Sequence, residues 1–96
     1  MKLAKPTDFE ILEILDDRGR NTAQNLALIL DKNRGYINTR LPHLSSLGLV
    51  RRVGPAENSG LYEVTQKGRI VLDHRETYGQ TEEFEELIRA ELDGNL

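Results

Sequence analysis

The chain has 96 residues, which is enough for one domain with a single hydrophobic core. Hydrophobic residues make up 38% and charged residues 30% of it, and no apolar run approaches the roughly 20 residues that cross a bilayer, so we expect no membrane association. The sequence has no cysteine and its N-terminus lacks the apolar stretch of a signal peptide, which favours a cytoplasmic protein without disulfides or thiolate metal sites.

The formal charge of −3 is distributed unevenly along the chain. Residues 32–52 contain five basic side chains and no acidic one, whereas residues 76–96 contain seven acidic side chains against one arginine, a charge of −6. Residues 1–75 therefore carry +3. A run of like charges is often only a solvated face of the protein. The basic segment therefore indicates a binding surface only if it falls on an element suited to binding.

The first helix is predicted to follow Pro6, with Thr7 as N-cap and Glu10 completing a capping box, and to end near Gly19. A very short strand is expected at residues 20–21. The helix carries apolar side chains for burial and nothing that suggests chemistry, so we interpret it as scaffold.

A second helix is predicted over residues 22–30, capped by Thr22 or Asn21, with Leu26 and Leu30 on its apolar face. Residues 31–33 form the expected turn, because Asp and Asn compete well for local backbone hydrogen bonds. Asn33 is the predicted cap of the next helix. Such a cap leaves free amides at the positive end of that helix, which suits a phosphate.

The third helix is predicted over residues 34–47, with apolar side chains every three or four residues on one face and short polar side chains on the other. The polar face is suited to reading a groove. Pro42 removes one amide and crowds the carbonyl of Asn38, so either the helix kinks there or it restarts at Pro42. Gly48 is expected to end the helix.

Two strands are predicted at residues 49–53 and 61–65, joined by a loop dense in turn residues, which together form a β-hairpin. Arg51 and Arg52 are consecutive and must point to opposite faces of the first strand. Thr65 is the expected cap of a further helix, and Gly68 in its first turn would let the backbone approach the hairpin closely.

The last predicted helix covers residues 81–92. Phe84 and Ile88 lie on one face with Leu87 and Leu92, and acidic residues lie on the other. Such an apolar stripe must be buried, either by folding back on this chain or against a partner.

The order helix, helix, turn, helix, hairpin over residues 7–73 resembles the winged helix-turn-helix fold. The resemblance is carried by residues 26–27, by residues 37–44 with the Leu-Gly-Leu-Val of residues 47–50, and by residues 61–69. These segments are similar to the recognition helix, Gly, Leu-Val, wing and Thr-x-x-Gly of many prokaryotic winged-helix regulators. The chain as a whole most resembles small repressor-like proteins of halophilic archaea and their phages.

The resemblance implies an α+β, mainly helical fold with a three-helix core, a two-stranded wing and additional C-terminal helices. It divides the chain into a DNA-binding domain at residues 1–75 and an acidic C-terminal helical extension at residues 76–96, which we expect to serve dimerisation. Recognition-helix positions are occupied by Arg34, Tyr36, Asn38, Thr39, Arg40 and His43, and wing positions by Arg51, Asn58 and Ser59, beside Arg52 of the same basic run. Arg40 lies only about 60° from the apolar stripe, so it suits a phosphate better than a base.

These features predict a sequence-specific DNA-binding transcriptional regulator, a repressor that acts as a homodimer through its first or its C-terminal helix. Residues 34–47 would read the major groove of double-stranded DNA and the wing at residues 49–65 the backbone or minor groove. The alternative is a winged helix used for protein contact in a transcription complex, with the acidic segment on a basic partner.

An enzyme is not expected. His43 and His74 lie far apart in the sequence without metal-ligand spacing, and no phosphate-binding loop or nucleophile elbow is present. We therefore predict no cofactor and no metal, and no residue indicates a small-molecule effector.

Overall fold

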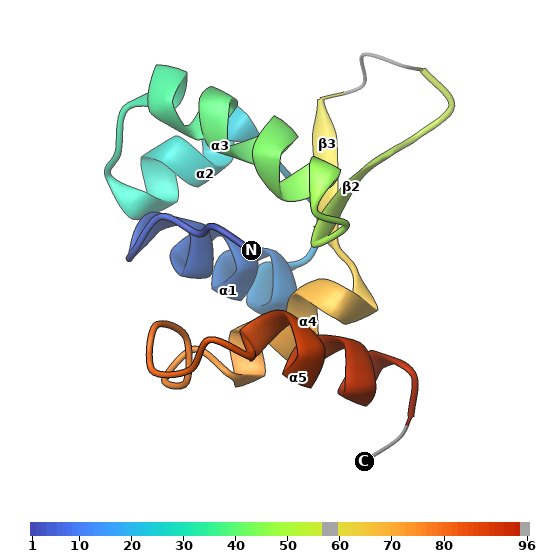
Figure 1. Cartoon of the computed structure of the whole chain (residues 1–96). Coiled ribbons are helices and arrows are strands. Elements are labelled where there is room, and N and C mark those ends of the chain that lie inside the picture. Colours follow the sequence, from blue (N-terminus) through green and yellow to red (C-terminus); the bar gives the residue numbers. More distant parts are fainter. Residues whose placement is uncertain (57–59, 95–96) are drawn as a thin grey trace.

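The computed structural model of the protein describes residues 1–56 and 60–94 (Figure 1). In chain order the elements are α1 (Thr7–Arg18), β1 (Asn21–Thr22), α2 (Ala23–Leu30), α3 (Arg34–Ser46), β2 (Val50–Val53), β3 (Leu61–Val64), α4 (Gln66–Asp73) and α5 (Phe84–Leu92). This is the predicted α+β, mainly helical winged-helix architecture. No helix in this part of the chain is long and apolar enough to cross a membrane.

Helix α1 runs through the centre of the molecule, with α2 and α3 on one side and α4 and α5 on the other (Figure 1). Its apolar side chains Phe9, Ile11, Leu12 and Leu15 are all at most 2% exposed. They pack in one cluster with Ile37, Leu41 and Leu44 of α3, whose spacing predicted this buried face. The scaffold role expected of the first helix follows from this central position.

The sheet has the strand order β1-β3-β2, with both pairings antiparallel. Strands β2 and β3 are the predicted hairpin, each shorter by one residue than expected. The brief strand foreseen at residues 20–21 forms at Asn21–Thr22, and Asn21 pairs with Tyr62. The sheet therefore has three strands where only a two-stranded wing was predicted, because β1 ties the start of α2 to the hairpin.

Three helix caps predicted from the sequence are present. The side-chain oxygens of Thr22, Asn33 and Thr65 accept hydrogen bonds from backbone amides three residues later, at 3.1, 3.0 and 3.0 Å. Each satisfies one of the amides that an α-helix leaves unpaired at its N-terminus. These caps fix where α2, α3 and α4 begin.

The capping box predicted for the first helix was wrong. The helix begins at Thr7 itself, with Pro6 at the cap position and no side-chain cap hydrogen bond. Thr7 is buried, with only 3% of its surface exposed. The Asp8 carboxylate accepts a hydrogen bond from the amide of Ala4 at 2.8 Å. Burial and this contact with the N-terminal segment replace the local cap.

Helix α3 is continuous from Arg34 to Ser46 with Pro42 inside it, so the alternative in which the helix restarts at Pro42 is excluded. Pro42 and Asn38 are both exposed. The missing hydrogen bond therefore falls on the exposed face of the helix, where water can reach the backbone. The helix ends one residue earlier than predicted, and Gly48 takes a φ of 77° immediately after it.

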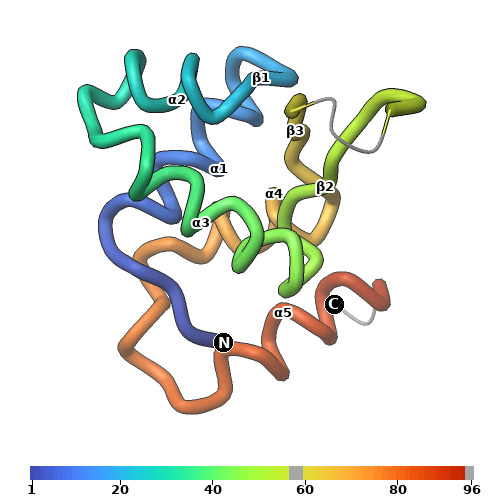
Figure 2. The backbone as a smooth tube through the Cα atoms, turned by 90° about the horizontal axis from the view of Figure 1, so that it is seen from above, coloured from blue at the N-terminus to red at the C-terminus, as the bar shows by residue number. Residues whose placement is uncertain are grey.

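The C-terminal segment folds back on its own chain (Figure 2). Phe84 and Ile88 are 5% and 0% exposed and belong to the same cluster as the side chains of α1. The ring of Tyr78 lies edge-on between Phe9 and Phe84, at centroid distances of 5.6 and 5.2 Å. Helix α5 begins three residues later than expected, and its predicted apolar stripe is buried at Phe84 and Ile88, whereas Leu92 at its end is exposed.

Gly68 is required where α4 passes the start of the hairpin. A Cβ atom at this position would lie 2.2 Å from the carbonyl oxygen of Leu49 and 2.7 Å from the Cγ2 atom of Val64. The nearest neighbour is backbone and cannot rotate away. The close approach foreseen from the sequence is confirmed.

Gly68→Ala should therefore destabilise the fold by about 3 kcal/mol, because the added methyl overpacks a fixed backbone contact. Gln66→Ala, in the exposed first turn of the same helix, is the matched control and should change stability by less than about 0.5 kcal/mol. Urea unfolding followed by circular dichroism measures both. Equal stability of the two variants would contradict the close approach.

Candidate nucleic-acid interface

The outward face of α3 is polar and accessible over its first two turns. Arg34, Gly35, Asn38 and Thr39 are exposed, and Tyr36 is 42% exposed, while Ile37 between them is fully buried. The Asn33 side chain caps this end by accepting from the amide of Tyr36. The start of α3 thus brings together backbone amides, the positive end of the helix dipole and the exposed Arg34 guanidinium. Such a combination favours the binding of an anion.

A polar cavity of about 260 Å³ lies between this end of α3 and the sheet. Three of the residues predicted from the sequence line it together: Arg34 and Asn38 from α3, and Arg52 from β2. The structure therefore brings α3 and β2 to one surface. The remaining lining residues are Thr22, Ala23, Gln24, Gly60 and Tyr62.

Gln24 was missed by the sequence analysis. It is exposed in the first turn of α2, next to the buried Ala23, and its amide group can both donate and accept. The sequence shows only a polar residue close to Thr22, the N-cap of α2. Gln24 becomes a candidate only because the fold places it in the same cavity as Arg34.

Arg52 is held over a neighbouring ring. Its Nε atom donates to the hydroxyl of Tyr62 at 3.1 Å, and its guanidinium carbon is 5.7 Å from the centre of that ring. The two residues are paired across β2 and β3. This contact orients the guanidinium on the side of the sheet that faces α3.

Arg51 lies on the opposite face of the same strand, as the alternation predicted. The Arg51 side chain is 69% exposed and pairs with Glu63. Glu63 also accepts a hydrogen bond from Arg20 at 3.1 Å. The hydrogen bond from Arg51, followed by that from Arg20, holds the pKa of the Glu63 carboxyl below its usual value. Arg51 therefore lines a separate cavity with Thr65 and Arg69.

Arg40 has an intramolecular partner. Its Nε and Nη2 atoms donate to the two carboxylate oxygens of Asp8 at 3.0 and 2.8 Å, and the Asp8 side chain is 0% exposed. The hydrogen bond to Asp8 raises the pKa of Arg40 above its usual value. This fork-shaped pair fastens α3 to α1 rather than leaving the guanidinium directed at solvent.

His43 and Thr39 also make internal hydrogen bonds. The Nε2 atom of His43 donates to the carbonyl of Lys2 at 2.7 Å, which fastens the N-terminal segment along α3. The Thr39 hydroxyl donates to the Tyr36 carbonyl at 2.6 Å, but this side chain is still exposed on the outer face. The predicted wing residues Asn58 and Ser59 lie outside the described residues.

In residues 1–56 and 60–94, no group of three or more His, Asp or Glu side chains is arranged to hold a metal ion. Another cavity, of about 310 Å³, lies elsewhere, between the far end of α3 and α5. The surface formed by α3 and β2 is a concentration of hydrogen-bonding groups and guanidinium charges.

Asp8→Ala should destabilise the fold by about 3 kcal/mol, because it leaves the half-buried Arg40 charge and the amide of Ala4 without their partner. Asp16→Ala removes the carboxylate of an exposed pair with Arg69 and should cost less than about 1 kcal/mol. Chemical denaturation of both variants gives the comparison. Similar losses would show that the Asp8–Arg40 pair has no special structural role.

Residues 5–51 match a family described as winged helix-turn-helix DNA-binding. The fold is similar to that in the crystal structure of T. acidophilum IdeR, with a TM-score of 0.58 and 18% sequence identity over 77% of this chain. The chain spans only 33% of the length of that protein. No curated protein matches the sequence. The match and the arrangement of α2, α3 and the β2–β3 hairpin identify the fold as a winged helix-turn-helix.

Proposed function

We propose that the protein is a transcriptional regulator that binds double-stranded DNA in the cytoplasm, with α3 in the major groove and the hairpin along the backbone or in the minor groove. The observation that carries this proposal is the convergence of Arg34, Asn38 and Arg52 on one cavity beside the exposed polar face of α3. The family match over residues 5–51 supports the same partner.

Within this proposal the exposed residues have distinct tasks. Asn38 carries a donor and an acceptor that match the N6 and N7 atoms of adenine, which suits sequence-specific reading. No hydrogen bond or ion pair within the described residues engages the Arg34 guanidinium, so it is available for a phosphate or a guanine. Tyr36 and Thr39 add contact surface on the same face.

Arg40 and His43 are assigned a different task. Because Asp8 and the Lys2 carbonyl already engage them, we propose that they orient α3 and that their loss acts on DNA binding through the position of the helix. Arg51 is proposed as a secondary backbone contact, since it is exposed but directed away from the α3 side of the sheet. Asn58 and Ser59 remain predictions for the wing.

The proposed mode of regulation is repression by a homodimer. Two copies related by a two-fold axis would present two α3 helices to half-sites about one helical turn apart. Of the two helices considered for the dimer contact, α1 has four of its apolar side chains enclosed in the core of this chain and the fifth, Ile14, partly buried against it. Helix α5 exposes Leu92 to 37%, so we favour α5.

The double variant Arg34→Ala/Arg52→Ala should weaken binding to a random-sequence duplex pool and make the salt dependence shallower. If both guanidinium groups contact phosphates, the slope of log K against log salt should fall by about 2. Fluorescence anisotropy across a salt series measures the affinity and the slope. Circular dichroism establishes that the variant is folded.

The matched control is Arg75→Ala/Arg89→Ala, which also removes two positive charges. One lies just after α4 and the other on α5. Its salt slope should equal that of the wild type. Should the control and the test variant lose affinity equally, binding would depend on net charge alone and the assigned surface would be wrong.

A second candidate is a protein-contact module, favoured by one observation. Glu82, Glu83, Glu85 and Glu86 are all exposed around the start of α5, which presents a dense acidic surface to a basic partner. Absence of DNA binding by the folded wild type at low salt would favour this candidate over the DNA-binding one.

The acidic surface should also act as a long-range brake on DNA binding. Neutralising Glu82, Glu83 and Glu86 to Gln should tighten nonspecific binding in about 0.01 M salt, where the screening length is about 30 Å. The effect should disappear near 0.15 M, where that length is about 8 Å. The anisotropy titration repeated at both concentrations tests this, and an effect that persists at the higher one would contradict long-range repulsion.

A further inference from the structure

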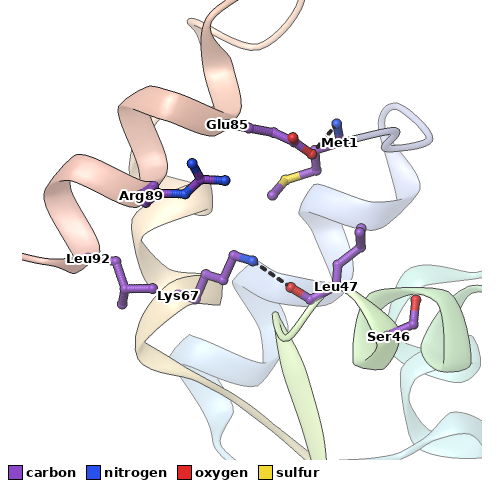
Figure 3. Close-up of a pocket in the computed structure, with 7 residues that line it drawn as sticks. All are labelled: Met1, Ser46, Leu47, Lys67, Glu85, Arg89 and Leu92. Carbon is purple, nitrogen blue, oxygen red and sulfur yellow. Dashed lines mark hydrogen bonds and ion pairs between the residues drawn. The ribbon is translucent and has the colours of Figure 1, made fainter.

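A second cavity lies between the N-terminal segment, the end of α3, and the helices α4 and α5 (Figure 3). Its volume is about 310 Å³, within the range of pockets that hold small molecules. The proposed DNA surface is at the other end of α3 and uses none of its lining. The residues that line it are Met1, Ser46, Leu47, Lys67, Glu85, Arg89 and Leu92.

Two cations reach this cavity from different helices. Figure 3 shows the Lys67 and Arg89 side chains directed into it from α4 and α5. The Lys67 ammonium donates one hydrogen bond, to the Leu47 carbonyl at 2.9 Å, and keeps two further donors. Arg89 is 64% exposed and its partner Glu86 is 71% exposed, so their contact at 3.1 Å is a weak surface pair. Both cations therefore have donors to spare.

The carboxylate that lines the cavity is already engaged. Glu85 pairs with the amino group of Met1 at 2.5 Å, and that hydrogen bond holds the pKa of Glu85 below its usual value. Glu85 therefore remains charged and bound to the N-terminus, and the nearby charges of Lys67 and Arg89 lower its pKa further. The Met1 ammonium, Lys67 and Arg89 outnumber this one carboxylate in the lining, so the cavity is cationic although it lies at the acidic end of the molecule.

Three of the remaining lining residues are apolar, and the fourth, Ser46, donates its hydroxyl to the His43 carbonyl. Leu47 is half-buried, Leu92 is 37% exposed and the Met1 side chain is 3% exposed. Figure 3 shows Met1 and Leu47 across the cavity from the two cations. A ligand that satisfies the whole cavity needs an anionic group for one wall and an apolar group for the other, because a purely inorganic anion leaves the apolar wall uncovered.

We propose that this cavity binds a small organic carboxylate, with its carboxylate paired to Lys67 and Arg89 and its apolar group against Met1 and Leu47. The site adjoins Ser46 and Leu47, so a bound ligand contacts the C-terminal end of α3. The proposed DNA surface lies at the N-terminal end of the same helix. The inference does not depend on DNA binding.

The test is a titration of the full chain with benzoate, followed by the amide NMR signals of Ser46, Leu47, Lys67 and Arg89. Benzoate should shift these signals saturably. Benzyl alcohol, which lacks the charge, and inorganic phosphate, which lacks the apolar group, should each bind at least about tenfold more weakly. No DNA is present, so failure here is distinguishable from failure of the proposed function.

Arg89→Gln should weaken benzoate binding about tenfold, and Arg89→Lys should recover part of the loss because it keeps the charge. Arg69→Gln is the control, since it also removes an exposed arginine and one surface ion pair, but on the far side of α4 from this cavity. It should bind benzoate as the wild type does. Undiminished binding by Arg89→Gln, equal binding of phosphate or benzyl alcohol, or no saturable shift with benzoate would overturn the proposal.

Discussion

The pair between Asp8 and Arg40 is the constraint on which the position of α3 depends. A carboxylate that is 0% exposed is costly to bury unless its oxygens are fully hydrogen-bonded, and here they accept from the Arg40 fork and from the Ala4 amide. One residue of α1 thus fixes both α3 and the N-terminal segment. His43, one turn beyond Arg40, fastens the same segment through the Lys2 carbonyl. The register of α3 against α1 follows from directional contacts as well as from apolar packing.

The cations of the basic run differ in their partners. Arg40 and Lys32 pair with Asp8 and Glu10 of α1, at 2.8 and 3.2 Å, and the exposed Arg51 pairs with Glu63. Arg34 and Arg52 line the cavity between α3 and the sheet, where Arg52 also donates to the Tyr62 hydroxyl. Counting basic residues along the sequence therefore overstates the charge available to a polyanion, whereas their position in the fold shows which charges are directed to one surface.

The features that were predicted correctly depend on residues close to one another in the sequence. Thr22, Asn33 and Thr65 each cap a helix through an amide three residues away, and the spacing of Ile37, Leu41 and Leu44 is itself the buried face. The features that were missed require distant partners. Asp8 and Arg40 are 32 residues apart, and Gln24 joins the candidate site only because β1 ties the start of α2 to β3. The failed cap at Thr7 belongs with them, since burial in the assembled core outcompeted a valid local motif.

The net charge of −3 is a poor guide to the partner because the molecule is long compared with the screening length. Its largest dimension is 35 Å, while charges at physiological salt are screened over about 8 Å. A ligand near α3 and β2 therefore responds mainly to Arg34 and Arg52, and a ligand near α5 responds to what surrounds it there. The same reasoning applies within the acidic end, where Glu85 is occupied by the N-terminus and Lys67 and Arg89 set the local sign. Short screening allows one small winged helix to present a cationic cavity at each end of α3 within an overall acidic chain.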